Sequence, residues 1–201
     1  MRFYLSASTC IVALTCFAGS ASADEKWTHF YAGLYSAYTL VDNHLSPTNG
    51  YAFAISGVSG GLMLGYDKQF NNLVLGFEGD AGLSGVNGSG TNNSWTVNMG
   101  GLDLSARARA GFAMDNLLIY GTGGFASSNM NVNYPSGPIL NQNRTGWQLG
   151  AGLEYALSEK LNLRGEYLYT DFGLSNGLIP SSSQQFQTTS STFRLGLSYK
   201  F

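Results

Sequence analysis

Charged residues are scarce in this 201-residue chain, and long apolar runs are missing. Asp, Glu, Lys and Arg together make up 11% of the sequence, whereas about a quarter is usual in soluble domains. This scarcity argues against an ordinary soluble α/β domain. No run of about 18 apolar residues occurs either, which excludes a helical membrane protein. The formal net charge of −2 supplies no basic patch, so nucleic acid is not expected as a partner.

Cysteine is nearly absent, and the two cysteines, Cys10 and Cys16, both lie close to the N-terminus. If this segment is removed, the remaining chain has neither a disulfide nor thiolate chemistry. A lipidated cysteine at the start of the mature chain is an alternative. The three residues before Cys16, Ala-Leu-Thr, match that pattern poorly.

Residues 1–23 have the features of a secretory signal peptide. Arg2 provides a short positive region, an apolar stretch follows, and the small residues 21–23 form a cleavage site. The apolar stretch is too short and too interrupted to span a bilayer as a helix. We therefore expect export, cleavage after Ala23, and one mature domain over residues 24–201.

The last ten residues alternate between two kinds of side chain. One set is apolar, namely Phe193, Leu195, Leu197, Tyr199 and Phe201, and the other consists of Arg194, Gly196, Ser198 and Lys200. A period of two predicts a β-strand, because successive side chains point to opposite sides of the pleat. In the chain as a whole, the polar faces of such segments carry charges of both signs and many glycines. This pattern indicates a barrel with an apolar face towards lipid and a polar interior.

Eight segments with this period follow one another, separated alternately by three tight turns and four long loops. They cover residues 30–40, 58–66, 73–83, 102–112, 117–127, 147–155, 161–169 and 193–201. About ten residues per strand are enough to cross the hydrocarbon region when the strand is tilted. An open sheet edge in lipid would leave backbone amides unpaired, so the sheet must close. We predict an all-β fold, an eight-stranded antiparallel up-and-down transmembrane β-barrel.

Two parts of the pattern are irregular. Residues 95–99 alternate in the opposite phase to the segment that follows them, and a β-bulge at Gly100-Gly101 would absorb the slip. Residues 117–127 are so apolar and glycine-rich that their two faces cannot be assigned. Aromatic residues near strand ends are expected to form the interfacial girdle, namely Trp27, Phe30, Tyr66, Phe112, Tyr155 and Phe201.

The predicted interior carries five acids and five bases. They are Glu78, Asp80, Asp103, Glu154 and Glu166, with Arg107, Arg109, Arg164, Arg194 and Lys200. A balanced, hydrogen-bonded network offsets the cost of burying these charges. An eight-stranded barrel is only wide enough to be filled by its own side chains. We therefore predict a plugged lumen that holds the barrel's shape. A proton path or a narrow porin-like pore is the alternative.

Catalytic and metal-binding signals are weak. The two histidines, His29 and His44, show no metal-ligand spacing, and no metal site is expected. The stretch 121–126 has the spacing of a dinucleotide-binding loop, but no helical pattern follows it. No serine near His44 has a nucleophile signature. We expect no enzyme activity and no resident cofactor.

Several segments resemble the small outer-membrane β-barrel family of alphaproteobacteria, which includes porin-like surface antigens and haemin-binding proteins. The resemblance covers residues 30–34, 76–80, 118–124, 150–156, 163–173 and 193–201, and it leaves the long loops unmatched. It implies an OmpA-like barrel in the outer membrane of a Gram-negative cell, with membrane lipid as a partner. It also implies that the terminal Tyr199 and Phe201 are read by the outer-membrane assembly machinery.

Functions within that family vary, and a fold alone does not choose among them. The favoured hypothesis is a surface protein that supports envelope integrity and presents its extracellular loops. Its rival is a receptor for haemin or a host surface molecule, using loop groups such as His44, Tyr51 and Tyr134. Lipocalin-like soluble binding, a third option, would require an apolar interior and a charged exterior.

Overall fold

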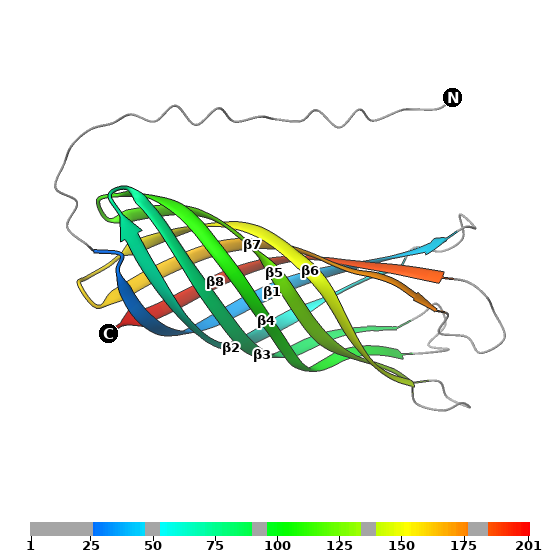
Figure 1. Ribbon diagram of the computed structural model, residues 1–201. Helices are drawn as coiled ribbons and strands as arrows, with labels where there is room; N and C mark the ends of the chain where they lie inside the picture. Colours follow the sequence, from blue (N-terminus) through cyan, green and yellow to red (C-terminus); the bar gives the residue numbers. More distant parts are fainter. Residues whose placement is uncertain (1–25, 47–52, 90–95, 134–139, 177–184) are drawn as a thin grey trace, which may run out of the picture.

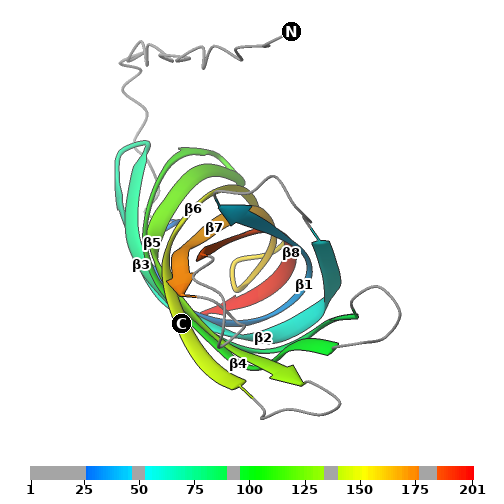
Figure 2. The ribbon, with the colours of Figure 1, turned by 90° about the vertical axis from the view of Figure 1, so that its right-hand side faces the viewer.

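The chain folds into one closed barrel in which each strand pairs antiparallel with the next and β1 pairs with β8 (Figure 1). The computed structural model describes residues 26–46, 53–89, 96–133, 140–176 and 185–201. Within these ranges, no helix is long and apolar enough to cross a membrane. The strands are β1 (His29–Ser46), β2 (Phe53–Phe70), β3 (Leu73–Ser89), β4 (Thr96–Met114), β5 (Leu117–Asn133), β6 (Leu140–Ala156), β7 (Leu161–Asn176) and β8 (Gln185–Lys200). The predicted eight-stranded barrel is confirmed, and the end-on view shows the strands closing into a ring (Figure 2).

Tight turns join the strands at the end of the barrel where the C-terminus lies (Figure 1). Two of them have two residues each, and their first residues, Asn71 and Asp115, have φ angles of 54° and 49°. Asn and Asp enter this left-handed region more easily than other non-glycine residues. In the third turn, Ser158 Oγ accepts a hydrogen bond from the Leu161 amide at 3.1 Å. Short turns face the periplasm in outer-membrane barrels, so we call this the periplasmic end and the opposite one the extracellular end.

The strands are longer than the apolar alternation predicts. They contain 16 to 19 residues, and the extensions lie at the extracellular end. Residues 41–46 and 84–89, which we expected to be loop, continue β1 and β3. The pairing of β1 with β8 runs to Ser46↔Gln185. Backbone ladder bonds do not require an apolar face, so strands continue past the hydrocarbon with polar side chains. The alternation therefore located only the membrane-facing part of each strand.

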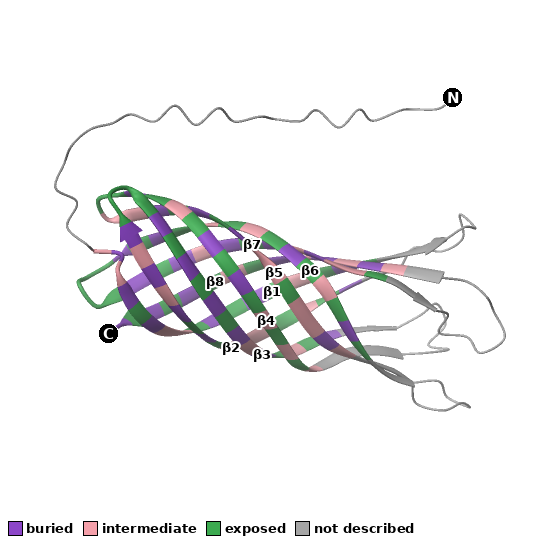
Figure 3. Cartoon of the chain, viewed as in Figure 1, coloured by how far each residue is buried: buried purple, intermediate pink, exposed green. Residues whose placement is uncertain are grey.

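Exposure alternates residue by residue along the strands (Figure 3). The consecutive residues Leu153 and Glu154 show the contrast, since Leu153 is 52% exposed and Glu154 is 0% exposed. Leu195 and Leu104 likewise face outward, whereas Arg107 faces the interior. Since the exposed side is apolar and the buried side is charged, the barrel has the arrangement expected for a protein surrounded by lipid.

The structure defines the phase of β5, which the sequence left open. Leu118, Tyr120 and Thr122 are buried, whereas Ile119 and Phe125 are exposed. Its pairing with β6 explains the choice, because Ile119 opposes the outward Leu153. Side chains directly opposite each other on paired strands share one face, so the well-phased neighbour determines the face of each β5 residue.

The predicted β-bulge in β4 occurs on one side of the strand only. The register with β5 shifts between Asn98 and Leu104, a region that includes the predicted Gly100-Gly101. The register with β3 runs without a break through Gly85↔Gly100 and Ser84↔Gly101. The irregularity is therefore confirmed on the side towards β5, while the ladder with β3 stays regular through the same residues.

Candidate functional site

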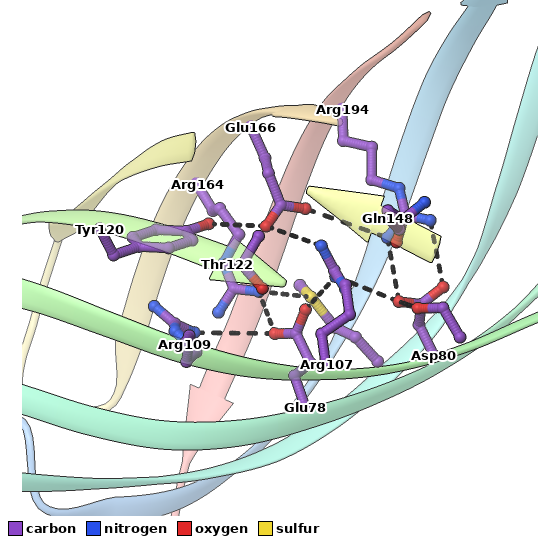
Figure 4. Close-up of polar contacts among 12 residues, drawn as sticks. Glu78, Asp80, Arg107, Arg109, Tyr120, Thr122, Gln148, Arg164, Glu166 and Arg194 are labelled. Carbon is purple, nitrogen blue, oxygen red and sulfur yellow. Dashed lines mark hydrogen bonds and ion pairs between the residues drawn. The ribbon is translucent and has the colours of Figure 1, made fainter. Parts of the chain in front are cut away.

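Glu78 on β3 lies at the centre of a group of buried charges (Figure 4). Its Oε1 pairs with Arg107 Nη2 and its Oε2 with Arg164 Nη1. Arg109 Nη1 lies 3.6 Å from Oε2, and the Tyr31 hydroxyl donates to Oε2 at 2.7 Å. One carboxylate on β3 thus binds side chains from β1, β4 and β7, which reach it across the lumen.

Glu154 on β6 forms a second centre towards the periplasmic end. Its Oε2 lies 2.7 Å from Arg109 Nη2 and 2.9 Å from Arg164 Nη2. The Asn162 amide donates to Oε1 at 2.7 Å. Arg109 also lies 3.6 Å from Asp67 Oδ2 on β2. Arg109 and Arg164 therefore link the two centres, since each contacts both Glu78 and Glu154.

A third group lies towards the extracellular end and involves Asp80 and Glu166. Asp80 Oδ1 lies 3.1 Å from Arg194 Nη2, and Asp80 Oδ2 lies 3.1 Å from Arg107 Nη2. Glu166 Oε1 lies 3.0 Å from Arg107 Nη1 and accepts a hydrogen bond from the Tyr120 hydroxyl at 3.1 Å. With this group included, every one of the eight strands contributes a side chain to one connected network.

The network is almost fully buried, and its charges are closely compensated. The paired side chains are at most 3% exposed, apart from Arg194 at 12%. Isolated ions in such surroundings would be very unfavourable, whereas paired and hydrogen-bonded ions are tolerated. Aromatic rings add to the compensation, because the guanidinium of Arg109 lies 4.1 Å from the Tyr120 ring centroid and that of Arg194 lies 4.2 Å from the Tyr35 centroid. The arrangement is suited to holding strands together and contains no exposed nucleophile.

The structure brings together eight of the ten predicted lumen charges and leaves two apart. The eight are Glu78, Asp80, Arg107, Arg109, Glu154, Arg164, Glu166 and Arg194. Asp103 faces the interior nearer the extracellular end and accepts hydrogen bonds from Ser84 and Ser128. Lys200 lies at the periplasmic end, where its Nζ is 5.7 Å from the Trp27 ring centroid.

Sequence reasoning missed several members of the interior. Tyr31 and Asp67 are both fully buried in the network but were not among the predicted interior charges. Tyr120 was missed because β5 had no assigned phase. Arg144 was assigned to a loop, yet it lies on β6 and is buried. Continuing the alternation upwards from Gln148 would have found it.

An apolar cluster closes the lumen at the periplasmic end. It consists of Trp27, Val74, Ala113, Leu118, Tyr120 and Ala156. Trp27, which we expected in the interfacial girdle, is only 1% exposed. Its backbone amide donates to Gln69 Oε1 at 2.9 Å, which holds the chain before β1 inside the barrel mouth. Because Trp27 precedes the strand, no alternation could assign its direction, and the girdle prediction for it is wrong.

A small polar cavity of about 70 Å³ lies on the extracellular side of the charge network. Hydroxyl and amide side chains line much of it, including Ser128, Gln148 and Thr170, with Asp103 and Arg194 among the charged groups. A larger depression of about 710 Å³ involves outward residues such as Leu153 and Leu195. Lipid covers that outer surface, so the polar cavity is the one that bears on ligand chemistry.

The comparison with known proteins identifies the family. Residues 9–201 match the family described as "Outer membrane protein beta-barrel domain". The chain belongs to this family of outer-membrane β-barrels. Its location in the outer membrane, which the sequence predicted, is thereby confirmed.

Relatives in this family come from alphaproteobacteria, as the resemblance implied. The 31 kDa outer-membrane immunogenic protein of Brucella melitensis biotype 1 is 31% identical over 208 residues, covering 88% of this chain and 84% of the relative. The 22 kDa outer membrane protein of Rhizobium leguminosarum bv. viciae is 31% identical over 180 residues, covering 88% and 79%. Neither is an enzyme by name. The chain is thus an outer-membrane barrel similar to proteins described as immunogenic in Brucella.

Solved structures show the same fold at low sequence identity. Neisserial surface protein A has a TM-score of 0.57 and 17% identity, covering 86% of this chain and 97% of its own. OprG from Pseudomonas aeruginosa has a TM-score of 0.56 and 14% identity, covering 89% and 99%. Likeness at this level of identity concerns the barrel fold alone.

The side chains proposed for haemin binding all lie outside the part of the chain that the structure describes. Tyr51 and Tyr134 lie outside the described residues. The backbone of His44 belongs to β1 and pairs with Gln187, but the structure does not describe its side chain. In the described part of the chain, no group of three His, Cys, Asp or Glu residues could hold a metal ion.

Proposed function

We propose that this protein is a structural surface barrel whose lumen is closed by its own side chains, and that it supports the integrity of the outer membrane. The charge network carries the proposal. It draws on all eight strands and is almost fully buried, so it braces the barrel from within. The apolar cluster around Trp27 adds a second closure at the periplasmic end. A barrel that is closed and cross-linked by ion pairs suits a structural role in the membrane better than a channel.

The names of the relatives support a surface role. Proteins described as immunogenic in Brucella share 31% identity with this chain, which fits a barrel that presents its extracellular end to the surroundings. A catalytic function is not part of the proposal, because the buried acids are held in ion pairs rather than exposed at a cleft. Binding of haemin or a host molecule through His44, Tyr51 and Tyr134 stays a hypothesis.

The closed lumen predicts very low conductance. Purified, folded protein in planar lipid bilayers is expected to show no large, steady channel steps, because ions would have to cross both the charge network and the Trp27 cluster. Insertion is checked by the gel mobility shift between unboiled and boiled samples, and an open porin in the same bilayer serves as calibration. Large, steady conductance would contradict the plugged lumen and favour the narrow porin-like pore.

The terminal aromatic residue predicts an effect on assembly. Phe201 is 77% exposed on the lipid side, and its amide donates to the Phe30 carbonyl at 2.9 Å, which helps to close β8 onto β1. Deletion of Phe201 is expected to reduce the amount of folded protein in the outer membrane several-fold. Quantitative blotting of outer-membrane fractions, with the heat-modifiable band as the folded species, measures this.

A matched substitution and an in vitro assay separate recognition from stability. Phe201→Tyr keeps an aromatic C-terminal residue and is expected to assemble normally. If the deleted residue serves recognition by the assembly machinery, the shortened chain still refolds in detergent although it fails in the cell. Normal surface levels of the shortened protein would contradict the assembly role.

A further inference from the structure

Within the described ranges of the chain, Arg144 on β6 is a buried cation without a counter-charge. It is 5% exposed, and its Nη1 donates a hydrogen bond to Thr188 Oγ1 on β8. No residue that the structure describes accepts a hydrogen bond from its Nε or Nη2. Among the residues described, none of the ion pairs involves Arg144. The other buried arginines, Arg107, Arg109 and Arg164, each pair with two or more carboxylates.

The two unpartnered nitrogens lie on one edge of the guanidinium. Nε–H and one N–H of Nη2 point in the same direction, so together they form a fork with two parallel donors. Carboxylates and phosphates match this fork with two oxygens, and such charge-assisted pairs are among the stronger hydrogen bonds in proteins. A buried guanidinium that keeps this edge free is strongly unfavourable unless an acceptor fills it.

The site adjoins the polar cavity described above. Arg144 opposes Ser128 in the β5–β6 register, and Ser128 lines the cavity. Gln148, which lies two inward positions below Arg144 on β6, lines it as well, and its Oε1 is also unpartnered. By the volume that one water needs, 70 Å³ holds about five water molecules. An oxyanion of four or five non-hydrogen atoms occupies a similar space.

Charged groups on the other strands affect whether the cavity favours an anion or a cation. Asp103 on β4 and Asp80 on β3 line the same cavity, as does Arg194 on β8. Asp80 is paired with Arg194, and Asp103 accepts from Ser84 and Ser128. A water-bridged contact between Arg144 and Asp103 is therefore the competing explanation for the free edge, and the experiment must distinguish the two.

We propose that Arg144 forms the binding site for a small oxyanion, a carboxylate or phosphate group, that enters the lumen from the extracellular end. Nε and Nη2 donate to two ligand oxygens, while Thr188 holds Nη1 in place. The burial of Arg144 favours a free small anion over a phosphate on lipopolysaccharide. A phosphate attached to a large lipid headgroup does not reach a nearly fully buried guanidinium.

The Nε–H resonance of Arg144 in ¹⁵N-labelled protein, refolded in detergent micelles, reports on this site directly. Sodium acetate and sodium phosphate are titrated separately against sodium chloride at constant ionic strength. We expect a saturable shift with acetate or phosphate. Arg144→Gln identifies the resonance by its loss and is expected to weaken binding of the anion at least about tenfold, as measured by calorimetry. Arg144→Lys keeps the charge but not the fork and should fall in between.

A second variant and a second ligand source distinguish oxyanion binding from the alternatives. Asp103→Asn is expected to strengthen oxyanion binding, because it removes a negative charge that repels the anion. If instead this variant shifts the Arg144 resonance without any anion and neither probe gives saturation, the water-bridged pair is correct and the proposal is overturned. A shift seen only with added lipopolysaccharide also overturns it. Lys160→Gln, in the exposed turn at the opposite end, is the control and should leave binding unchanged.

Discussion

Replacing Glu78 by glutamine is expected to lower the free energy of unfolding by about 3–5 kcal/mol, the usual cost of removing one partner from a buried ion pair. The carboxylate of Glu78 contacts Arg107 and Arg164 closely and Arg109 at 3.6 Å. A neutral amide of the same shape would leave these three cations buried with one negative charge fewer. Urea unfolding of the protein in lipid vesicles, followed by tryptophan fluorescence, measures the loss.

Two variants test whether the loss comes from the network. Glu159→Gln removes an acid in the exposed periplasmic turn and is expected to change stability by less than about 0.5 kcal/mol. Combining Glu78→Gln with Arg164→Gln should cost less than the sum of the single changes, because the second change removes a cation left unpaired by the first. Stability of Glu78→Gln equal to that of the parent would contradict the bracing role of the network.

Placing a charge on the outer face has the second large expected effect. Leu195 on β8 is 68% exposed and lies between the outward aromatic residues Phe193 and Tyr199. In lipid, Leu195→Arg is expected to destabilise the barrel by about 2–4 kcal/mol, the range for Arg near the bilayer midplane. In water the same exposed position would tolerate arginine with little change. The same urea unfolding assay in vesicles measures the difference.

Leu157→Arg is the matched control for the outer face. Leu157 is also an exposed leucine, but it lies in the periplasmic turn between β6 and β7. Near the interface the cost of arginine falls to about 0–1 kcal/mol. Equal costs at Leu157 and Leu195 would mean that position relative to the bilayer does not matter, and the assignment of the outer face to lipid would then be wrong.

The face of most strand residues could be predicted from the sequence because it depends on local geometry. Side chains alternate along any strand, so Leu153 and Glu154 must point in opposite directions wherever β6 lies. The apolar side of the pattern then identifies the lipid face. The method failed where the alternation was uninformative, as in β5, where apolar residues and glycines occupy both faces. There the phase came from pairing with β6.

Contacts across the lumen could not be predicted in the same way. The pairing of Glu78 with Arg107 follows from adjacent strands, since the two residues are directly opposite in the β3–β4 register. The pairing of Glu78 with Arg164 joins β3 to β7, and it depends on strand tilt and barrel diameter. Neither quantity is encoded in any short segment.

The sequence by itself determined the fold class, the strand phases other than that of β5, and ten of the charges that face the barrel interior, because all three follow from a period of two and from lipid as solvent. Only the tertiary structure decided how those charges pair, that Trp27 turns into the lumen, and that Arg144 is buried with no carboxylate of the described residues paired to it. These features depend on closure, which brings distant strands within contact distance across a narrow interior.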